Sequence, residues 1–288
     1  MPDLSWTPLK LIAWTQDFFA KKGIDAPRLT AEVLLAHALS CDRVRLYLDF
    51  DKPLGEPELA RYRDLVRRRS EGEPTAYLVG RREFYGRPFR VDPRVLVPRP
   101  ETELLVEAAL AALPAGGRAL DLCTGSGCVA ISLALAGKGV RVLATDLSED
   151  ALAVARENAA ALGAVVELAA GDLWSAVHGG EPFDVVVSNP PYIPGKELDS
   201  LPREVRREPC IALDGGEDGL AVLRRIVEGA PARLRPGGTL CVEMHESHLE
   251  SLPALCRAAG FTRAEARRDL AGLPRLVVAT LASPEDPA

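Results

Sequence analysis

A buried strand, a glycine turn and a helix follow one another in the stretch Arg118-Ala119-Leu120-Asp121-Leu122-Cys123-Thr124-Gly125-Ser126-Gly127, which continues into the apolar run 128–135. This order brings loop backbone and a helix N-terminus close to a bound ligand. The glycine pattern is Asp-x-x-x-Gly-x-Gly and not the full Gly-x-Gly-x-x-Gly. A pyrophosphate-binding dinucleotide site is therefore less expected at this turn.

Acidic side chains follow the next two predicted strands. The strand 140–146 ends in Asp146, about twenty residues beyond the glycine turn, where a carboxylate can bridge ribose hydroxyls. The strand 165–168 is followed by Asp172 and Trp174, an acid and an aromatic that can read an adenine amino group and cover its ring. Each acid alone is also consistent with a helix N-cap or a solvated loop carboxylate. The ordered series of strand ends favours a ligand site.

Asn189-Pro190-Pro191-Tyr192 directly follows a fourth apolar run, 183–188. Proline fixes φ and has no N–H, so this loop offers carbonyl acceptors without competing donors. The side-chain oxygen of Asn189 and the carbonyl of Pro190 can each accept one hydrogen of a planar –NH2 group, and Tyr192 can lie against its flat face. The motif indicates chemistry on an amide or an exocyclic amine. A proline-rich tight turn without such a role is the alternative.

Three regions differ in their patterns. Residues 1–80 contain helix patterns that begin near Thr7, Pro27 and Glu56, which predict a small helical bundle. Residues 81–100 alternate and are broken by turns, which predicts a β-hairpin linker. Residues 101–288 alternate helix and strand, which is typical of a mostly parallel, doubly wound α/β sheet.

The composition narrows the class of protein. The 288 residues are 47% hydrophobic and 26% charged, enough for an α/β domain and a smaller one. The net charge of −6 argues against a dedicated nucleic-acid binder. We expect no signal peptide and no membrane span, and the six unpatterned cysteines indicate reduced thiols in a cytoplasmic protein. His245 and His248 have the residue type and spacing of metal ligands, but we expect no metal site.

Together these motifs resemble the class I S-adenosylmethionine-dependent methyltransferases, and the Asn189 loop is similar to the amino-group methyltransferase signature. Further segments resemble the release-factor glutamine methyltransferases of the PrmC/HemK type, and the resemblance covers nearly the whole chain. These segments are Arg82-Glu83-Phe84-Tyr85-Gly86, Val97-Pro98-Arg99-Pro100-Glu101-Thr102-Glu103, Val205-Arg206-Arg207-Glu208-Pro209, Ala212-Leu213-Asp214-Gly215-Gly216-Glu217-Asp218-Gly219 and Arg268-Asp269-Leu270-Ala271-Gly272. The resemblance implies a Rossmann-like methyltransferase sheet whose final strand, 276–280, is antiparallel. It also implies that the helical bundle of residues 1–80 is a substrate-docking domain.

The resemblance also assigns roles. It implies that Asn189 and Pro190 align the reacting amide, within a substrate loop that extends through Pro191 and Tyr192. The residues expected to hold S-adenosylmethionine, which leaves as S-adenosylhomocysteine, are Asp121, Cys123, Thr124, Gly125, Ser126, Gly127, Asp146, Asp172, Trp174 and Asn189. Cys123 is a departure, since the family's turn usually starts with glycine. A positive φ there would strain a cysteine. The Cys123 thiol could be reactive, but we favour the alternative that it is a small, packed thiol.

The implied reaction is methylation of the glutamine amide nitrogen in the Gly-Gly-Gln motif of class I peptide chain release factors. The expected partner is that protein substrate, with no direct contact to nucleic acid or membrane, and the family suggests a monomer. The alternatives are an amino-group methyltransferase acting on DNA or rRNA bases, and one acting on glutamine of a ribosomal protein. A cofactor-binding regulator without catalysis, or a translation-factor chaperone, is the alternative from a different class.

Overall fold

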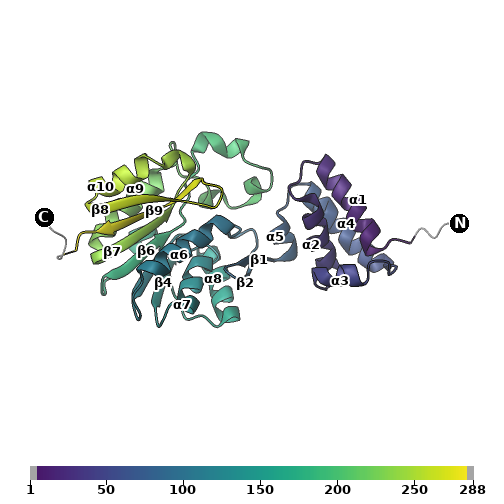
Figure 1. The fold of residues 1–288 in the computed structure, drawn as a ribbon, viewed down its shortest axis with the longest axis horizontal. Coiled ribbons are helices and arrows are strands. Elements are labelled where there is room, and N and C mark those ends of the chain that lie inside the picture. Colours follow the sequence, from purple (N-terminus) through teal and green to yellow (C-terminus); the bar gives the residue numbers. More distant parts are fainter. Residues whose placement is uncertain (1–4, 284–288) are drawn as a thin grey trace. The chain divides into compact units, whose positions relative to one another are not determined.

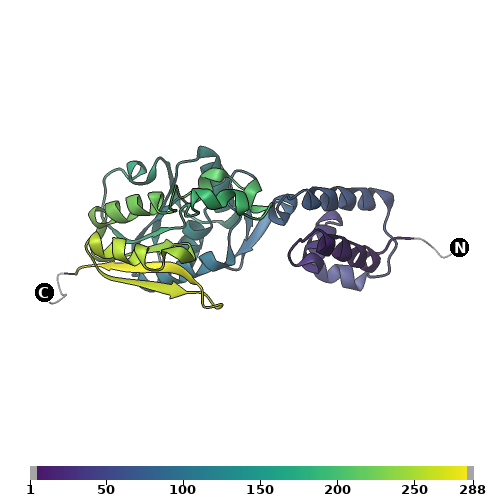
Figure 2. The ribbon, with the colours of Figure 1, turned by 90° about the horizontal axis from the view of Figure 1, so that it is seen from above.

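The computed structural model describes residues 5–283 and divides the chain into two compact units (Figures 1 and 2). The helical unit is the chain up to Arg81, joined by the distant segment Pro202–Arg207. The sheet unit comprises Arg82–Leu201 and the chain from Glu208 onward. No helix among residues 5–283 is both long and apolar enough to cross a bilayer.

The helical unit contains five α-helices and one short 3-10 turn. They are α1 (Pro8–Lys21), α2 (Pro27–Ala38), α3 (Arg43–Leu48), α4 (Glu56–Ser70), α5 (Thr75–Val79) and η4 (Val205–Arg207). The predicted helical character is confirmed, while α3 and α5 are too short to show a period in the sequence. Proline in the first turn starts α1, α2 and α4 without loss of a helical hydrogen bond. The Asp42 carboxylate caps α3 by accepting the Arg45 N–H at 2.8 Å.

A core of its own holds the helical unit together. Phe19, Leu34, Leu35, Leu46 and Tyr62 are buried within one cluster to which all five of these helices contribute. The burial of such side chains is the main favourable term in forming a bundle of short helices. The helical unit is therefore a packed body and not an extended arm.

The sheet unit begins with a hairpin and continues as alternating strands and helices. Its strands are β1 (Arg81–Phe84), β2 (Arg87–Arg90), β3 (Arg118–Leu122), β4 (Arg141–Asp146), β5 (Glu167–Ala170), β6 (Phe183–Ser188), β7 (Leu234–Glu243), β8 (Phe261–Arg268) and β9 (Pro274–Leu281). Its α-helices are α6 (Glu103–Ala112), α7 (Cys128–Ala136), α8 (Glu149–Leu162), α9 (Ala221–Gly229) and α10 (Ser251–Ala258). Short 3-10 turns are η1 (Pro100–Thr102), η2 (Leu173–Ala176), η3 (Gly195–Ser200), η5 (Cys210–Ala212), η6 (Ala230–Ala232) and η7 (Glu246–His248).

Seven strands form the main sheet in the order β5-β4-β3-β6-β7-β9-β8. The pairs from β5 to β7 are parallel, and β9 is antiparallel to both of its neighbours. The expected sheet, mostly parallel with an antiparallel final strand, is confirmed. The sequence analysis did not anticipate β8, whose alternation of small and charged residues is a weak strand signal.

Helices cover both faces of this sheet, with α6, α7 and α8 on one side and α9 and α10 on the other (Figure 1). Alternate residues of the buried strands supply the two apolar layers, as with Leu120 on one face and Ala119 on the other. The hairpin residues Phe84 and Phe89 are buried in the second layer, with ring centroids 6.0 Å apart. The hairpin thus packs mostly as part of the sheet unit.

Candidate active site

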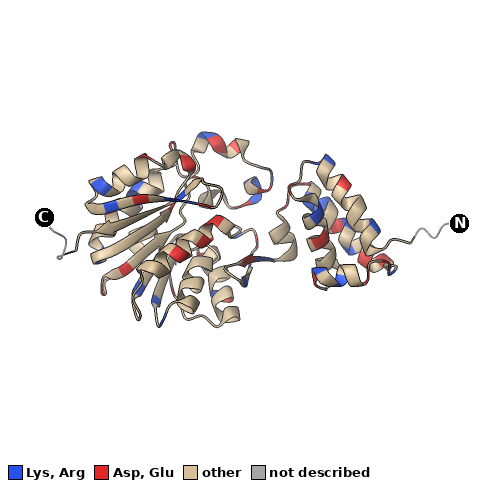
Figure 3. Cartoon of the chain, viewed as in Figure 1, with Lys and Arg blue, Asp and Glu red and all other residues tan. Residues whose placement is uncertain are grey.

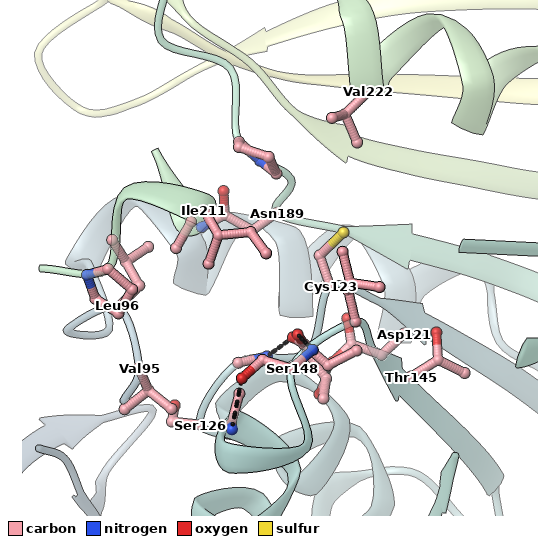
Figure 4. A pocket seen from close by; sticks show the side chains of 18 of the residues that line it. Val95, Leu96, Asp121, Cys123, Ser126, Thr145, Ser148, Asn189, Ile211 and Val222 are labelled. Carbon is pink, nitrogen blue, oxygen red and sulfur yellow. Dashed lines mark hydrogen bonds between the residues drawn. The ribbon is translucent and has the colours of Figure 1, made fainter. Parts of the chain in front are cut away.

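The sheet unit encloses a cavity of about 370 Å³ at the carboxyl ends of β3, β4 and β6. From β3 the chain proceeds outward through β4 to β5, and it then crosses to β6 on the opposite side of β3. Ligands of open α/β sheets bind at such a reversal of strand order. The lining includes the predicted residues Asp121, Cys123, Thr124, Gly125, Ser126, Asp146, Asp172, Asn189 and Pro191 (Figure 4).

The turn between β3 and α7 depends on backbone conformations that favour glycine. The φ angles of Cys123, Gly125 and Gly127 are 61°, 56° and 79°. A Cβ added at Gly127 would approach Ile131 Cδ1 to 3.0 Å and Ala155 Cβ to 3.1 Å, so glycine is required there both for conformation and for packing. Gly127 itself packs behind the cavity and does not line it.

Cys123 occupies a position of this turn that favours glycine, because its φ is positive. Its Cβ makes this left-handed backbone conformation sterically unfavourable. Burial raises the pKa of its thiol, which keeps it protonated and favours the packed thiol over a reactive thiolate. Its sulfur packs against the apolar layer that contains Leu122.

Cys123→Gly should yield a more stable protein than Cys123→Ala, by about 1 kcal/mol in the free energy of unfolding. Both substitutions remove the thiol, but only glycine relieves the left-handed backbone. Urea unfolding of the two variants, followed by circular dichroism, measures the difference. Equal stability would mean that the turn relaxes when alanine is present and stores no strain.

Asp121 is the second-last residue of β3 and has 1% of its surface exposed. Its Oδ2 accepts the Thr124 hydroxyl at 2.7 Å and the Ala130 N–H at 3.2 Å. Burial raises the pKa of this carboxyl to about 7, and the two hydrogen bonds only partly counter it. A cationic group bound in the cavity would restore its charge.

Asp146, the last residue of β4, also lines the cavity. Its Oδ2 accepts the Gly125 N–H at 2.8 Å and its Oδ1 accepts the Ser148 N–H at 2.9 Å, so the carboxylate joins the glycine turn to the start of α8. Burial raises its pKa as well. Asp172 is more exposed and pairs with Arg225 at 2.8 Å.

Trp174 lies elsewhere than the sequence suggested. Its indole N–H donates to the Arg225 carbonyl at 2.8 Å, and its ring packs so closely on α9 that a Cβ at Gly229 would lie 2.2 Å from Nε1. The cavity wall at this strand end is formed by Leu173 and Gly171 instead. Trp174 therefore fixes η2 against α9 and is not among the residues that line the cavity.

The Asn189 loop joins the cavity to a buried polar network. Asn189 lines the cavity, and its Nδ2 donates to the Thr102 hydroxyl oxygen at 3.1 Å. The Tyr192 hydroxyl donates to Glu243 Oε1 at 3.0 Å. Pro190 is buried, and neither it nor Tyr192 belongs to the cavity lining. The carboxamide oxygen of Asn189 is thus its available acceptor.

Two segments that sequence reasoning left without a role close the cavity. They are residues 95–98 and 209–212, and the buried carboxylate of Glu208 joins them by accepting the Val97 N–H at 2.9 Å and an Arg99 guanidinium hydrogen at 2.5 Å. The segments that carry the family resemblance overlap these two stretches only in part, at Val97, Pro98, Pro209 and Ala212, and that overlap is the one signal of them in the sequence.

The charge of the cavity suits a cation. The Asp121 carboxyl is buried and the Asp146 carboxyl is half-buried, whereas the lining arginines, Arg94 and Arg225, are already paired with Asp92 and Asp172. Glycine backbone, acids at two strand ends and an apolar wall therefore fit a nucleoside that carries positive charge. Within residues 5–283, no group of three or more His, Cys, Asp or Glu side chains is arranged to hold a metal.

Comparisons with known proteins identify the family to which these two units are similar. The PrmC N-terminal domain model matches residues 10–80, and the methyltransferase small domain model matches residues 100–204. The release factor glutamine methyltransferase of Geobacter sulfurreducens is 44% identical over 273 residues, which cover 94% of this chain and 96% of that protein. The protein of the same name from Chlorobaculum tepidum is 47% identical over 253 residues, 83% of this chain and 86% of its own.

Solved structures agree on the fold. A 16S rRNA methyltransferase from Thermus thermophilus, in complex with AdoMet and guanosine, has a TM-score of 0.54 and 21% identity over 70% of this chain and 49% of that one. A methyltransferase from Pyrococcus furiosus has a TM-score of 0.53 and 21% identity, and the match covers 69% of this chain and 91% of that one. At this identity the likeness concerns the fold alone.

Proposed function

The chain belongs to the family of release factor glutamine methyltransferases, and from this we propose that it methylates the side-chain amide nitrogen of a glutamine in class I peptide chain release factors. The glutamine is that of the Gly-Gly-Gln motif. The observation that carries the proposal is the Asn189 carboxamide, held at the cavity with its Nδ2 engaged by Thr102 and its Oδ1 left to accept an amide N–H.

The chemistry divides between cofactor and protein. S-adenosylmethionine supplies an electrophilic sulfonium methyl group. A glutamine amide is a poor nucleophile because its nitrogen lone pair is delocalised into the carbonyl. Asn189 Oδ1 accepts one amide hydrogen, which aligns the nitrogen and strengthens this bond as positive charge grows on it. Pro190, whose carbonyl was expected to accept the other hydrogen, does not line the cavity. The N–CH3 bond forms as the S–CH3 bond breaks, and the nitrogen then loses its proton to water.

The residues that we propose for the cofactor follow from the same cavity. Asp121 and Asp146 would face its ammonium group and its ribose hydroxyls, and the turn through Thr124, Gly125 and Ser126 would contact its methionine portion. Asp172 stands at the edge of the adenine side. The carboxyls of Asp121 and Asp146 offset the positive charges of the bound cofactor.

The decisive experiment uses recombinant, unmodified release factor. We expect incubation with this protein and S-adenosylmethionine to add one methyl group to the glutamine of the Gly-Gly-Gln motif, mapped by mass spectrometry of the tryptic peptide. A release factor with that glutamine replaced by alanine should remain unmodified. Methyl transfer to duplex DNA, ribosomal subunits or a ribosomal protein, with no change in the release factor, would refute the proposal.

Cofactor binding should depend on pH through Asp121. Its pKa in the free protein is about 7, and a bound ammonium group favours the charged carboxylate. Below pH 7 the cofactor must displace a proton, so its affinity should fall about tenfold between pH 8 and pH 6. Calorimetry in two buffers of different ionisation enthalpy measures this proton release. Asp121→Asn should bind more weakly at every pH and release no proton; an unchanged proton count would assign the effect to another group.

We propose that the helical unit docks the release factor. Trp6, Leu9 and Phe50 are 40%, 45% and 48% exposed, and the Leu9 N–H donates to the Phe50 carbonyl at 3.3 Å, which places α1 beside the turn after α3. Exposed aromatic side chains that lie together are typical of protein interfaces.

The double variant Trp6→Ala with Phe50→Ala should raise KM for the intact release factor about tenfold and leave kcat unchanged. With a short Gly-Gly-Gln peptide as substrate, the variant should match the parent protein. Val165→Ala, which alters an exposed side chain of the sheet unit, is the control. An equal KM change for peptide and release factor would place the contact elsewhere.

A protein substrate is also consistent with the charges of the helical unit. Arg67 and Arg68 pair with neighbouring acids, and Arg69 is buried against Glu204. Lys and Arg alternate with Asp and Glu on its helices (Figure 3), so its cations are balanced locally. We propose that the protein acts as a cytoplasmic monomer without direct contact to nucleic acid, which light scattering and salt-insensitive kinetics would test.

A further inference from the structure

We propose that Thr102 and Glu243 are positioning residues, which determine whether the oxygen or the nitrogen of the Asn189 carboxamide faces the substrate. This inference rests on the proposed function, since it concerns the acceptor of the glutamine amide hydrogen. Thr102 stands in η1 at the start of α6, and Glu243 is the final residue of β7. Their side chains are 2% and 3% exposed.

The network contains two hydrogen-bonded pairs of side chains. Asn189 Nδ2 donates to Thr102 Oγ1 at 3.1 Å, and the Tyr192 hydroxyl donates to Glu243 Oε1 at 3.0 Å. Glu243 Oε2 is buried without a well-formed hydrogen bond in the described residues, yet the Thr102 hydroxyl is close enough to lower the pKa of this carboxyl. Thr102 occupies the N-cap position of α6 but makes no cap hydrogen bond, so its hydroxyl is free for Glu243.

The direction of each hydrogen bond follows from counting donors. An ionised Glu243 can only accept, so it takes hydrogens from both Tyr192 and Thr102. The Thr102 hydroxyl has one hydrogen, and once this is directed to Glu243 its oxygen can only accept from Asn189. The carboxamide must then present Nδ2 to Thr102 and Oδ1 to the cavity. A neutral Glu243 would remove this requirement, because Thr102 could then donate to Oδ1 and the NH2 group would face the substrate.

Burial raises the pKa of Glu243 to about 7, so its charge changes near neutral pH. Around it, Tyr192 and Thr102 donate to the carboxyl, Glu101 raises its pKa, Arg275 lowers it, and the Cys128 thiol also faces it. The His245 ring lies 6.5 Å from the Tyr192 ring and is the other titratable group beside the network. At saturating cofactor, kcat should therefore fall as the pH drops below 7.

A double-mutant cycle separates positioning from mere structural support. With release factor as substrate, Thr102→Val should lower kcat about tenfold at pH 8 and change the Kd for S-adenosylmethionine less than about twofold. Thr102→Ser, which restores the hydroxyl, should regain most of the rate. In an Asn189→Ala background, Thr102→Val should change kcat by less than about twofold, because the group through which it acts is already absent.

Glu243→Gln should lower kcat at pH 8 and abolish its decline below pH 7, whereas His245→Asn should keep the parent profile. Three results would overturn the inference: full activity of Thr102→Val, an equal loss from Thr102→Val with and without Asn189, or an unchanged pH profile in Glu243→Gln. Failure of the parent protein to methylate release factor would instead refute the proposed function, so the two outcomes are distinct.

Discussion

Asn189→Ala is expected to reduce kcat for release factor methylation by about 100- to 1000-fold, the loss typical of removing one preorganised acceptor from a reacting centre. The loss should appear in kcat, because the Asn189 oxygen gains most when the amide hydrogens become acidic in the transition state. The Kd for S-adenosylmethionine should stay within about threefold of the parent value, since the acids of the cavity are untouched. Single-turnover methylation and calorimetry measure the two quantities separately.

The matched control is Asn158→Ala. Asn158 also uses its carboxamide fully: it accepts the Arg90 N–H at 2.7 Å and donates to the Arg90 carbonyl at 3.0 Å and to the Ser126 carbonyl at 2.9 Å, but it does not line the cavity. Its replacement should lower the melting temperature and spare the chemical step of folded protein. If Asn189→Ala retained more than about one tenth of the parent kcat, the loop would serve binding and not alignment.

Asp146→Ala is expected to weaken S-adenosylmethionine binding about 100-fold. The carboxylate accepts backbone hydrogens from both Gly125 and Ser148, so its loss removes the proposed ribose contact and also releases the glycine turn. Because the cofactor must then order the turn on binding, the effect should exceed that of a single hydrogen bond. Equilibrium binding of the cofactor by fluorescence or calorimetry gives the measurement.

Asp172→Ala offers the comparison within the same cavity. This carboxylate is about half exposed and paired with Arg225, so its removal should weaken cofactor binding by less than about fivefold. A larger loss from Asp172→Ala than from Asp146→Ala would place the ribose at the strand end of β5 and not at that of β4.

The features of this architecture that could be predicted from the sequence are those set by local patterns of residues. The strand, glycine turn and helix around Asp121 and the acceptor loop at Asn189 are each set by a few consecutive residues, and the structure brings both to one cavity. The position of Trp174 could not be predicted, because it depends on a close contact with Gly229 on another element. Pairing of Arg99 with Glu208 spans 109 residues and leaves no local signature.

The polar network behind Asn189 could not be predicted from the sequence for the same reason. Thr102, Tyr192 and Glu243 come from three separate elements, and no periodicity in the chain relates them. The hydrogen bonds are specified only when the sheet has assembled. Sequence reasoning therefore located the acceptor and missed the groups that orient it.

The place of β9 in the sheet has a consequence for biosynthesis. Pro274–Leu281 pairs with β7 on one side and β8 on the other, although both neighbours precede it on the chain. Until the ribosome has delivered β9, β8 has no strand partner and one edge of β7 is unpaired, and such edges invite association with other nascent chains. The pairing of β8 and of the outer edge of β7 therefore waits until β9 has been synthesised, while the β3 to β6 half can form earlier in elongation.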